Sequence, residues 1–304
     1  MRSPARHPRL AALALAIPLL LAACAAVSPS PSPTPPGPID HPTDDTVIFR
    51  IEYQGGLMGP DFLFPNYPVF VLLGDGRVIM EGAQIESFPG PALPAIIVRQ
   101  LTEAGVQAIL REVAATAQFG ASVRWHAADT MVADGSDAIF TLRAEGREIV
   151  VSVYALGQVS PDLVPPGMTA TELAAHAALL QLVNRVTLLE SWLPSGAWAT
   201  AQWVPYVPDA MRLVARNADA DPPDNGGLPP GELPWPVAGD PATFGSQLSD
   251  GRRCAVVTDD ELDAWYAALA SANQLTLFTF EEHRYQVAVW LLLPDDPRVC
   301  ERPT

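Results

Sequence analysis

Two stretches of the chain share one helical spacing of apolar residues, and this feature constrains the fold most. Apolar side chains at i, i+3, i+4 and i+7 lie on one face of an α-helix, which needs another layer to bury it. The positions are Val106, Ile109, Leu110 and Val113 in the first stretch, and Leu262, Trp265, Tyr266 and Leu269 in the second. An offset of 156 residues relates the two sets and also carries Thr102, a helix N-cap residue type, onto Thr258.

Strand patterns surround both helices. Residues 46–53 alternate in polarity, and a hairpin is predicted where 69–73 and 77–80 flank Gly74-Asp75-Gly76, because glycine supplies the positive φ of a tight turn. The other predicted strands are 138–143 and 148–155 as a second hairpin, a short strand at 211–216, 254–257 before the second helix, and 275–280 and 285–293 as a third hairpin.

A longer helix is predicted from Thr169, because Thr169 and Glu172 have the spacing of a capping box. The same spacing recurs at Thr258 and Glu261, at the start of the last helix. The apolar face of the longer helix consists of Leu179, Leu182, Val183 and Val186.

Both stretches therefore have the order strand, helix, hairpin. Because such units pack a helix face on an antiparallel sheet, we expect an α+β fold with two degenerate β-α-β-β units. We expect a first α+β unit at 46–190, a Pro- and Trp-rich connecting segment at 191–247, and a second β-α-β-β unit at 248–304.

The N-terminus has the pattern of an export signal. Three Arg occur in residues 1–9, and residues 10–21 form an apolar run too short to span a bilayer, which takes about 20 residues. A basic start, a short apolar run and a small-residue exit are typical of a cleaved signal peptide, here 1–23. The exit, Leu21-Ala22-Ala23-Cys24, resembles the lipobox of bacterial lipoproteins. The resemblance implies cleavage before Cys24 and a diacylglycerol thioether on its sulfur.

Residues 24–45 are predicted to be a stalk. Proline alternates with Ser and Thr from Ser28 to Pro36, and such a sequence favours an extended polyproline II spacer. The 46–155 stretch with its GDG hairpin is also loosely similar to secreted and lipoprotein domains of bacteria. That similarity implies an envelope location and brings no activity with it.

Charge and motifs exclude several functions. The formal net charge is −16 and all 18 basic residues are Arg, so we expect no nucleic-acid partner and no lysine-based catalysis. The sequence contains no G-x-S-x-G, P-loop, H-E-x-x-H or C-x-x-C motif, and its five His lack metal-ligand spacing. A calcium loop at Asp219–Asn225 is disfavoured because two prolines interrupt it. We therefore expect no metal and no cofactor.

The two remaining cysteines, Cys254 and Cys300, lie at the ends of the second predicted unit. Outside the cytoplasm disulfides persist, so we predict a bridge between them. Free buried thiols are the alternative.

The 191–247 segment is long for a connection and rich in aromatic residues, which argues against disorder. Aromatic rings on proline-stiffened loops form binding surfaces, although they also form covers over a sheet. The candidate ligand-binding residues are Trp198, Trp203, Tyr206 and Trp235.

We expect a monomeric lipoprotein on the extracytoplasmic face of the bacterial membrane, anchored by the lipid on Cys24. Since no catalytic constellation stands out, the expected role is a non-catalytic binding or scaffolding module for an unknown protein or carbohydrate partner. One alternative is an inhibitor of a secreted enzyme, which would use a protruding loop. The other is a cell-envelope hydrolase, which would need a pocket with a polarised His or carboxylate pair.

Overall fold

Two mostly antiparallel sheets and three helices make up the part of the chain that the computed structural model describes, namely residues 37–56, 67–84, 87–125, 134–158, 164, 166–221 and 227–300. The predicted α+β class is confirmed. The predicted signal peptide, Cys24 and most of the stalk lie outside the described residues. From Pro38 on, the chain forms one unit.

The first sheet has eight strands in the order β5-β7-β6-β1-β2-β3-β4-β8. In chain order these are β1 (Val47–Gly55), β2 (Phe70–Leu73), β3 (Arg77–Glu81), β4 (Ile96–Gln100), β5 (Val123–Trp125), β6 (Ser136–Ala144), β7 (Arg147–Tyr154) and β8 (Val204–Pro205). Neighbouring strands are antiparallel except β5 and β7. The two predicted hairpins of this region are confirmed as β2–β3 and β6–β7.

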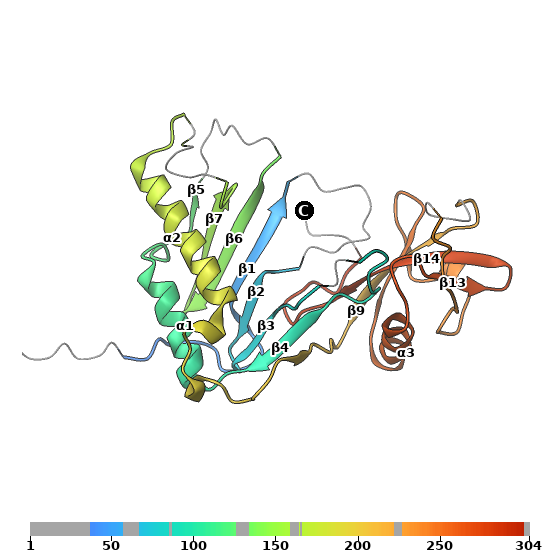
Figure 1. The fold of residues 1–304 in the computed structure, drawn as a ribbon, viewed down its shortest axis with the longest axis horizontal. Coiled ribbons are helices and arrows are strands. Elements are labelled where there is room, and N and C mark those ends of the chain that lie inside the picture. The colour runs from blue at the N-terminus through green and yellow to red at the C-terminus, as the bar shows by residue number, and fades with distance from the viewer. Residues whose placement is uncertain are drawn as a thin grey trace, which may run out of the picture. The chain divides into compact units, whose positions relative to one another are not determined.

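Helices α1 (Glu103–Ala115) and α2 (Ala170–Thr187) cover one face of this sheet (Figure 1). The predicted apolar faces of both helices are buried, in one cluster with rings such as Phe49 and Phe140. The capping box of α2 is confirmed, because the Thr169 hydroxyl accepts from the Glu172 N–H and the Glu172 carboxylate accepts from the Thr169 N–H. Sequence periodicity therefore locates this layer well.

The second sheet has six strands in the order β10-β13-β14-β9-β12-β11. They are β9 (Met211–Asn217), β10 (Glu232–Pro234), β11 (Ser246–Gln247), β12 (Arg253–Val257), β13 (Leu277–Phe280) and β14 (His283–Leu291). Helix α3 (Asp259–Ala270) packs on this sheet through Leu262, Trp265 and Leu269. The capping box predicted at its start is wrong: the Thr258 hydroxyl donates to the neighbouring Asp259 carboxylate and makes no cap.

The segment at 191–247 supplies strands to both sheets. Short 3₁₀ turns η1 (Leu189–Ser191), η2 (Ser195–Ala197) and η3 (Pro241–Thr243) interrupt it. Strand β8 joins the edge of the first sheet, whereas β9 lies inside the second sheet between β14 and β12. The short strand predicted at 211–216 is confirmed as β9, so the second sheet begins within the stretch predicted to be a connection. Because β9 is buried on both faces, its sequence lacks the alternation of a half-exposed strand.

The two stretches with strand, helix and hairpin occupy their sheets differently, so the predicted repeat is not confirmed. In the first sheet, β6 is the first strand of the hairpin after α1 and lies nearer the middle of the sheet than β7. Three strands separate β6 from β4, the strand that precedes α1. In the second sheet, the second hairpin strand, β14, lies nearer the middle, and only β9 separates it from β12, the strand that precedes α3.

The first sheet with α1 and α2 forms a first region, and the second sheet with α3 forms a second region. The two regions share one hydrophobic cluster, which includes Val71 and Ile79 of the first and Leu213 and Trp265 of the second. The uncovered face of β2, β3 and β4 thus packs on the second region. Hydrogen bonds reinforce the contact. The Leu291 N–H donates to the Tyr67 oxygen at 2.8 Å, and the Ala92 N–H donates to the Ala272 carbonyl at 3.1 Å.

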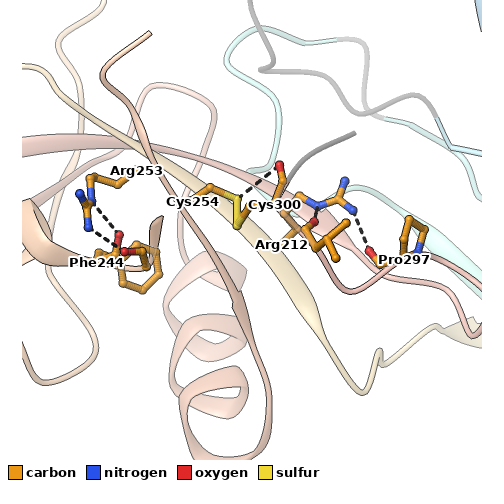
Figure 2. Close-up of a disulfide and its surroundings, with 8 residues drawn as sticks. Arg212, Phe244, Arg253, Cys254, Pro297 and Cys300 are labelled. Carbon is orange, nitrogen blue, oxygen red and sulfur yellow. Dashed lines mark hydrogen bonds between the residues drawn. A yellow bond between two sulfur atoms is a disulfide. The ribbon is translucent and has the colours of Figure 1, made fainter. Parts of the chain in front are cut away.

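The predicted disulfide joins Cys254 in β12 to Cys300 near the C-terminus, with the Cα atoms 5.7 Å apart (Figure 2). Arg212 in β9 holds the same C-terminal segment, because its guanidinium donates to the carbonyls of Pro297 and Val299 at 2.9 and 2.8 Å. No helix in the described ranges is both long and apolar enough to cross a membrane.

Candidate functional site

The structure separates the four aromatic residues that the sequence singled out. Trp198 and Trp203 are half-buried and meet edge to face, with ring centroids 5.9 Å apart. Tyr206 and Trp235 are only 6% and 8% exposed and belong to the core shared by the two sheets. The Tyr206 hydroxyl donates to the Leu292 carbonyl, and Trp235 packs on Trp265 at 4.7 Å. These two rings therefore stabilise the fold and offer little surface to a ligand.

Arg99 of β4 fixes the loop that carries Trp198 and Trp203. Its guanidinium lies 3.8 Å from the Trp198 ring centroid and donates to the carbonyls of Thr200 and Ala201 at 3.1 and 2.9 Å. It also pairs with Glu190 at 2.5 Å, and the Trp203 indole N–H donates to the same carboxylate oxygen at 3.2 Å. A buried guanidinium needs such a full set of partners to offset its lost hydration.

Trp203 lines an apolar groove of about 560 Å³ between β3, β4 and η1, here called the Trp203 groove. Its apolar lining consists of Met80, Ile97, Leu188, Leu189 and Trp203. The two hydroxyls in the lining are already bound, since Thr187 donates to the Val183 carbonyl and Ser191 to the Leu188 carbonyl. Two carboxylates complete the lining: Glu190 already accepts from Arg99 and Trp203, and burial raises the pKa of Glu81.

A second cavity, of about 530 Å³, lies where β1 and β6 meet the end of β14 and the following C-terminal segment. Because Phe49, Ile51 and Phe140 point into the core under the helices, Arg50, Glu52 and Thr141 lie on the opposite face of the sheet. The polar lining includes Arg50, Glu52, Gln54, Thr141, Arg143, Arg212, Asp295 and Asp296, and the aromatic lining is Tyr53, Tyr67 and Trp290. We call this site the Arg50 cavity.

Arg50 is the centre of an ion cluster in this cavity. Its Nε, Nη1 and Nη2 atoms donate to carboxylates of Glu52, Asp295 and Asp296 at 2.8, 2.5 and 3.0 Å. Burial acts to lower the pKa of Arg50, but the three carboxylates raise it more, so the guanidinium stays charged. Since Asp295 and Asp296 belong to the C-terminal segment, Arg50 ties this segment to the first sheet.

The carboxylates of the cluster have further donors. The second oxygen of Glu52 accepts from the Gln54 amide at 2.7 Å, and the second oxygen of Asp296 accepts from the Leu293 N–H at 2.9 Å. Asp295 differs, because its second oxygen has only a loose contact, 3.8 Å from Arg143. Burial raises the pKa of Asp295 above its ordinary value, against the attraction of Arg50.

The aromatic side of the cavity is rigid. Tyr67 is buried, its oxygen accepts from the Leu291 backbone, and burial raises its pKa far above the usual range of a phenol. Trp290 is buried in a small cluster with Val214 and Leu292 beside the disulfide. These rings therefore form a fixed wall next to the charged cluster.

The sequence prediction did not include the Arg50 cavity. Its polar residues come from non-core positions of two predicted strands and from the Asp295-Asp296-Pro297 turn, which are 245 residues apart along the chain. One signal was present: Arg50 and Glu52 alternate with core residues on β1, which indicates a polar sheet face. Only the fold reveals that acidic residues of the C-terminal segment meet this face.

Another polar pair lies at the tip of the second sheet. The His283 Nδ1 atom lies 2.7 Å from the Asp219 carboxylate, which lowers the pKa of Asp219 to about 2 and raises the pKa of His283. Both side chains are exposed and line neither cavity. Of the disfavoured calcium loop, Asp219 binds His283 and Asp221 binds Arg216, while Asp224 and Asn225 lie outside the described residues.

Among the described residues, no group of three or more His, Cys, Asp or Glu side chains is arranged to hold a metal ion. Comparisons with protein-family models, with curated proteins and with solved structures found no match to this chain.

Proposed function

We propose that this chain is a lipid-anchored, extracytoplasmic binding module whose ligand occupies the Arg50 cavity. The observation that carries the proposal is the cavity itself, about 530 Å³ in volume and lined by a fixed charged cluster and rigid rings. Small-molecule sites have volumes of about 300–1,000 Å³, aromatic walls and a few well-placed polar groups. The Trp203 groove has a similar volume, but its charged lining consists only of two carboxylates, Glu81 and Glu190, of which Glu190 is already paired with Arg99.

The pairing within the cluster supports binding over catalysis. A general acid or base needs a proton or lone pair within reach of the substrate. Glu52 and Asp296 each use both carboxylate oxygens to accept hydrogen bonds from the protein. Their role is therefore to fix Arg50 and the wall of the cavity.

A hydrolase is the second candidate function, and the environment of the Asp295 carboxyl favours it. Its carboxyl has a raised pKa and one oxygen without a close partner among the described residues. Paired carboxyl groups with different pKa values are typical of glycoside hydrolysis. Turnover of a bound ligand by the wild type, lost in Asp295→Asn with ligand binding retained, would establish this alternative in place of the binding module.

The attachment of the stalk supports a tethered module. The Ile39 N–H donates to the Gln107 side chain of α1 at 2.8 Å, and the Gln107 amide donates back to the Ile39 carbonyl at 2.8 Å. The Glu145 N–H also donates to the Asp40 carbonyl at 2.8 Å. These bonds hold the last part of the predicted stalk against α1 and the β6–β7 turn, so the spacer part of the predicted stalk ends before Ile39.

The anchor is tested by mass spectrometry of the membrane fraction. We expect a mature N-terminus at diacylglyceryl Cys24, and we expect Cys24→Ser to release the protein or leave it uncleaved. A processed Cys24→Ser chain that still partitions with the membrane would contradict the lipoprotein proposal.

The binding site is tested with the full chain in detergent micelles, titrated with mixed sets of small polar and apolar probes under NMR. We expect at least one probe to shift resonances of cavity residues on β1 and β6. Thr141→Trp, which fills the cavity, should abolish these shifts, whereas Ser152→Ala on the adjacent strand β7 should retain them. Probes that shift only residues of the Trp203 groove would contradict the assignment of the site.

A further inference from the structure

The charges that line the Arg50 cavity balance. Three Arg side chains (Arg50, Arg143 and Arg212) face three carboxylates (Glu52, Asp295 and Asp296). A charged ligand gains little from such a site, because each attraction is accompanied by a repulsion at similar range. An anionic ligand is further disfavoured by the net charge of −16 of the whole chain.

The polar groups of the cavity that remain available to a ligand include both hydrogen-bond donors and acceptors. Among the described residues the Thr141 hydroxyl, a donor and an acceptor, has no hydrogen-bond partner, although it lies on the cavity wall. The Gln54 amide donates to Glu52, which leaves its carbonyl oxygen as an acceptor. Arg143 donates through Nε to Glu148 and through Nη1 to the Val47 carbonyl, which leaves Nη2 as a donor. A ligand with many hydroxyls matches this mixture, because each hydroxyl both donates and accepts.

The remaining wall is aromatic and aliphatic. Tyr53 is half-buried on β1, and Trp290, Leu292 and Pro297 line the cavity from the second region. An apolar ligand would fit this wall but would leave the polar groups opposite without water or partners, which is costly. A sugar ring presents C–H groups on its faces and hydroxyls at its rim, and so satisfies both walls.

We infer that the Arg50 cavity binds an uncharged carbohydrate, a unit of one or two sugar rings. This inference rests on the proposed function, because it names the ligand class of the same site. The fixed geometry of Arg50 and Glu52 favours it, since preorganised polar groups lose little conformational entropy when a ligand binds.

The test compares four classes of probe by isothermal titration and NMR on the full chain in micelles. The probes are N-acetylglucosamine and maltose as neutral sugars, glucuronic acid as an anion, glucosamine as a cation and cyclohexanol as an apolar ring. We expect a neutral sugar to bind best and to shift cavity resonances. Thr141→Val, which keeps the shape but removes the hydroxyl, should weaken its binding about tenfold, and Ser152→Ala should leave it unchanged.

The outcomes separate this inference from the proposed function. Binding of the anion, the cation or the apolar ring at the cavity, without binding of either neutral sugar, overturns the inference and leaves a binding site in place. Neutral-sugar binding that Thr141→Trp does not remove also overturns it, because the sugar then binds elsewhere. If no class of probe binds at the cavity, both the inference and the proposed function fail.

Discussion

The two regions of this molecule reach an ordered core by different means. In the first region, two amphipathic helices cover an eight-stranded sheet, and the core consists of aliphatic residues with a few Phe. In the second region, one helix and six strands surround an aromatic core with Trp235, Trp265 and Phe278. The second region has fewer strands and helices than the first, and small domains compensate for a small core with cross-links.

The cross-links of the second region are polar and covalent. Arg253 donates to the carbonyls of Phe244 and Gly245 at 2.9 and 2.6 Å, and Arg212 holds the C-terminal segment in the same way (Figure 2). The disulfide closes a loop of 46 residues around β12, α3, β13 and β14. Arg50 then joins this region to the first. The periodic apolar pattern of the helices therefore determines the fold of the first region, whereas a few individual side chains hold the second region together.

The largest loss of stability is expected from a substitution in the aromatic core of the second region. Trp265 is fully buried, with the rings of Trp235 and Phe278 at 4.7 and 5.1 Å. Trp265→Ala should lower the free energy of unfolding by about 4 kcal/mol, because it removes a large ring and leaves a cavity. Urea unfolding monitored by circular dichroism measures this change. Trp192→Ala, at a half-buried ring of the first region, is the control and should cost less. Equal losses in the two variants would contradict the contrast between the regions.

Removal of the disulfide should have the next largest effect. The double variant Cys254→Ala/Cys300→Ala should lose up to about 4 kcal/mol, since the unfolded chain regains the entropy of an open loop of 46 residues. Hydrogen exchange should show the loss mainly in β12, α3 and β14. Uniformly faster exchange in α1 and α2 would show that the disulfide stabilises both regions equally.

A smaller loss of stability is expected when the ion pairs of Arg50 with the C-terminal segment are removed. Arg50→Leu should cost about 2 kcal/mol, because it leaves Asp295 and Asp296 partly buried without their cation. Arg124→Leu removes an exposed partner of Asp137 and should change stability by less than about 0.5 kcal/mol. Calorimetry of Arg50→Leu should show a lower Tm in a single transition, because the two sheets still share a hydrophobic cluster; an unchanged Tm would refute the link.

The smallest expected effect is the pH dependence of stability. One histidine in each region contributes to it, and the two contributions have opposite signs. His176 on α2 is buried without a hydrogen-bond partner among the described residues, and burial lowers its pKa. The unfolded chain therefore binds a proton first, and stability falls as the pH drops below about 6.5. His283 has a raised pKa because of Asp219, so its contribution is complete below about 6.5 and is lost as the pH rises through the folded pKa.

Substitutions at the two His residues separate these contributions. His176→Leu should stabilise the protein by about 1 kcal/mol near pH 5.5, since an unpaired buried polar group is removed. His283→Leu should make acid destabilisation steeper. Denaturant midpoints measured between pH 5 and 8 provide the test, and an unchanged pH profile in His176→Leu would contradict the assignment.

The sequence predicted the first region better than the second for physical reasons. The helix faces of α1 and α2, the GDG turn and the Thr169 cap depend on local patterns and are confirmed. Strand β9 is buried on both faces and lacks alternation, so its sequence predicts a short strand at 211–216 but not its central position in the second sheet. The disulfide could be predicted because the choice of partner is small when two cysteines remain.

The candidate site was the least predictable part. The aromatic residues of the 191–247 segment were the candidates. Of these, Trp198 and Trp203 contact each other in the structure, whereas Tyr206 and Trp235 are buried in the core. The contact between Arg50 and Asp295 joins residues 245 positions apart, and no local pattern reports such a pairing. Composition indicates that aromatic and charged residues are available, and the topology decides which of them meet.

A crystal structure of the protein soaked with N-acetylglucosamine tests the central claim most directly, because it allows the Arg50 cavity and the Trp203 groove to compete. We expect density for the sugar among Arg50, Tyr53 and Thr141, with a hydrogen bond to the Thr141 hydroxyl and an empty Trp203 groove. Sugar density in the Trp203 groove alone, with the Arg50 cavity empty or filled by protein side chains, would contradict it.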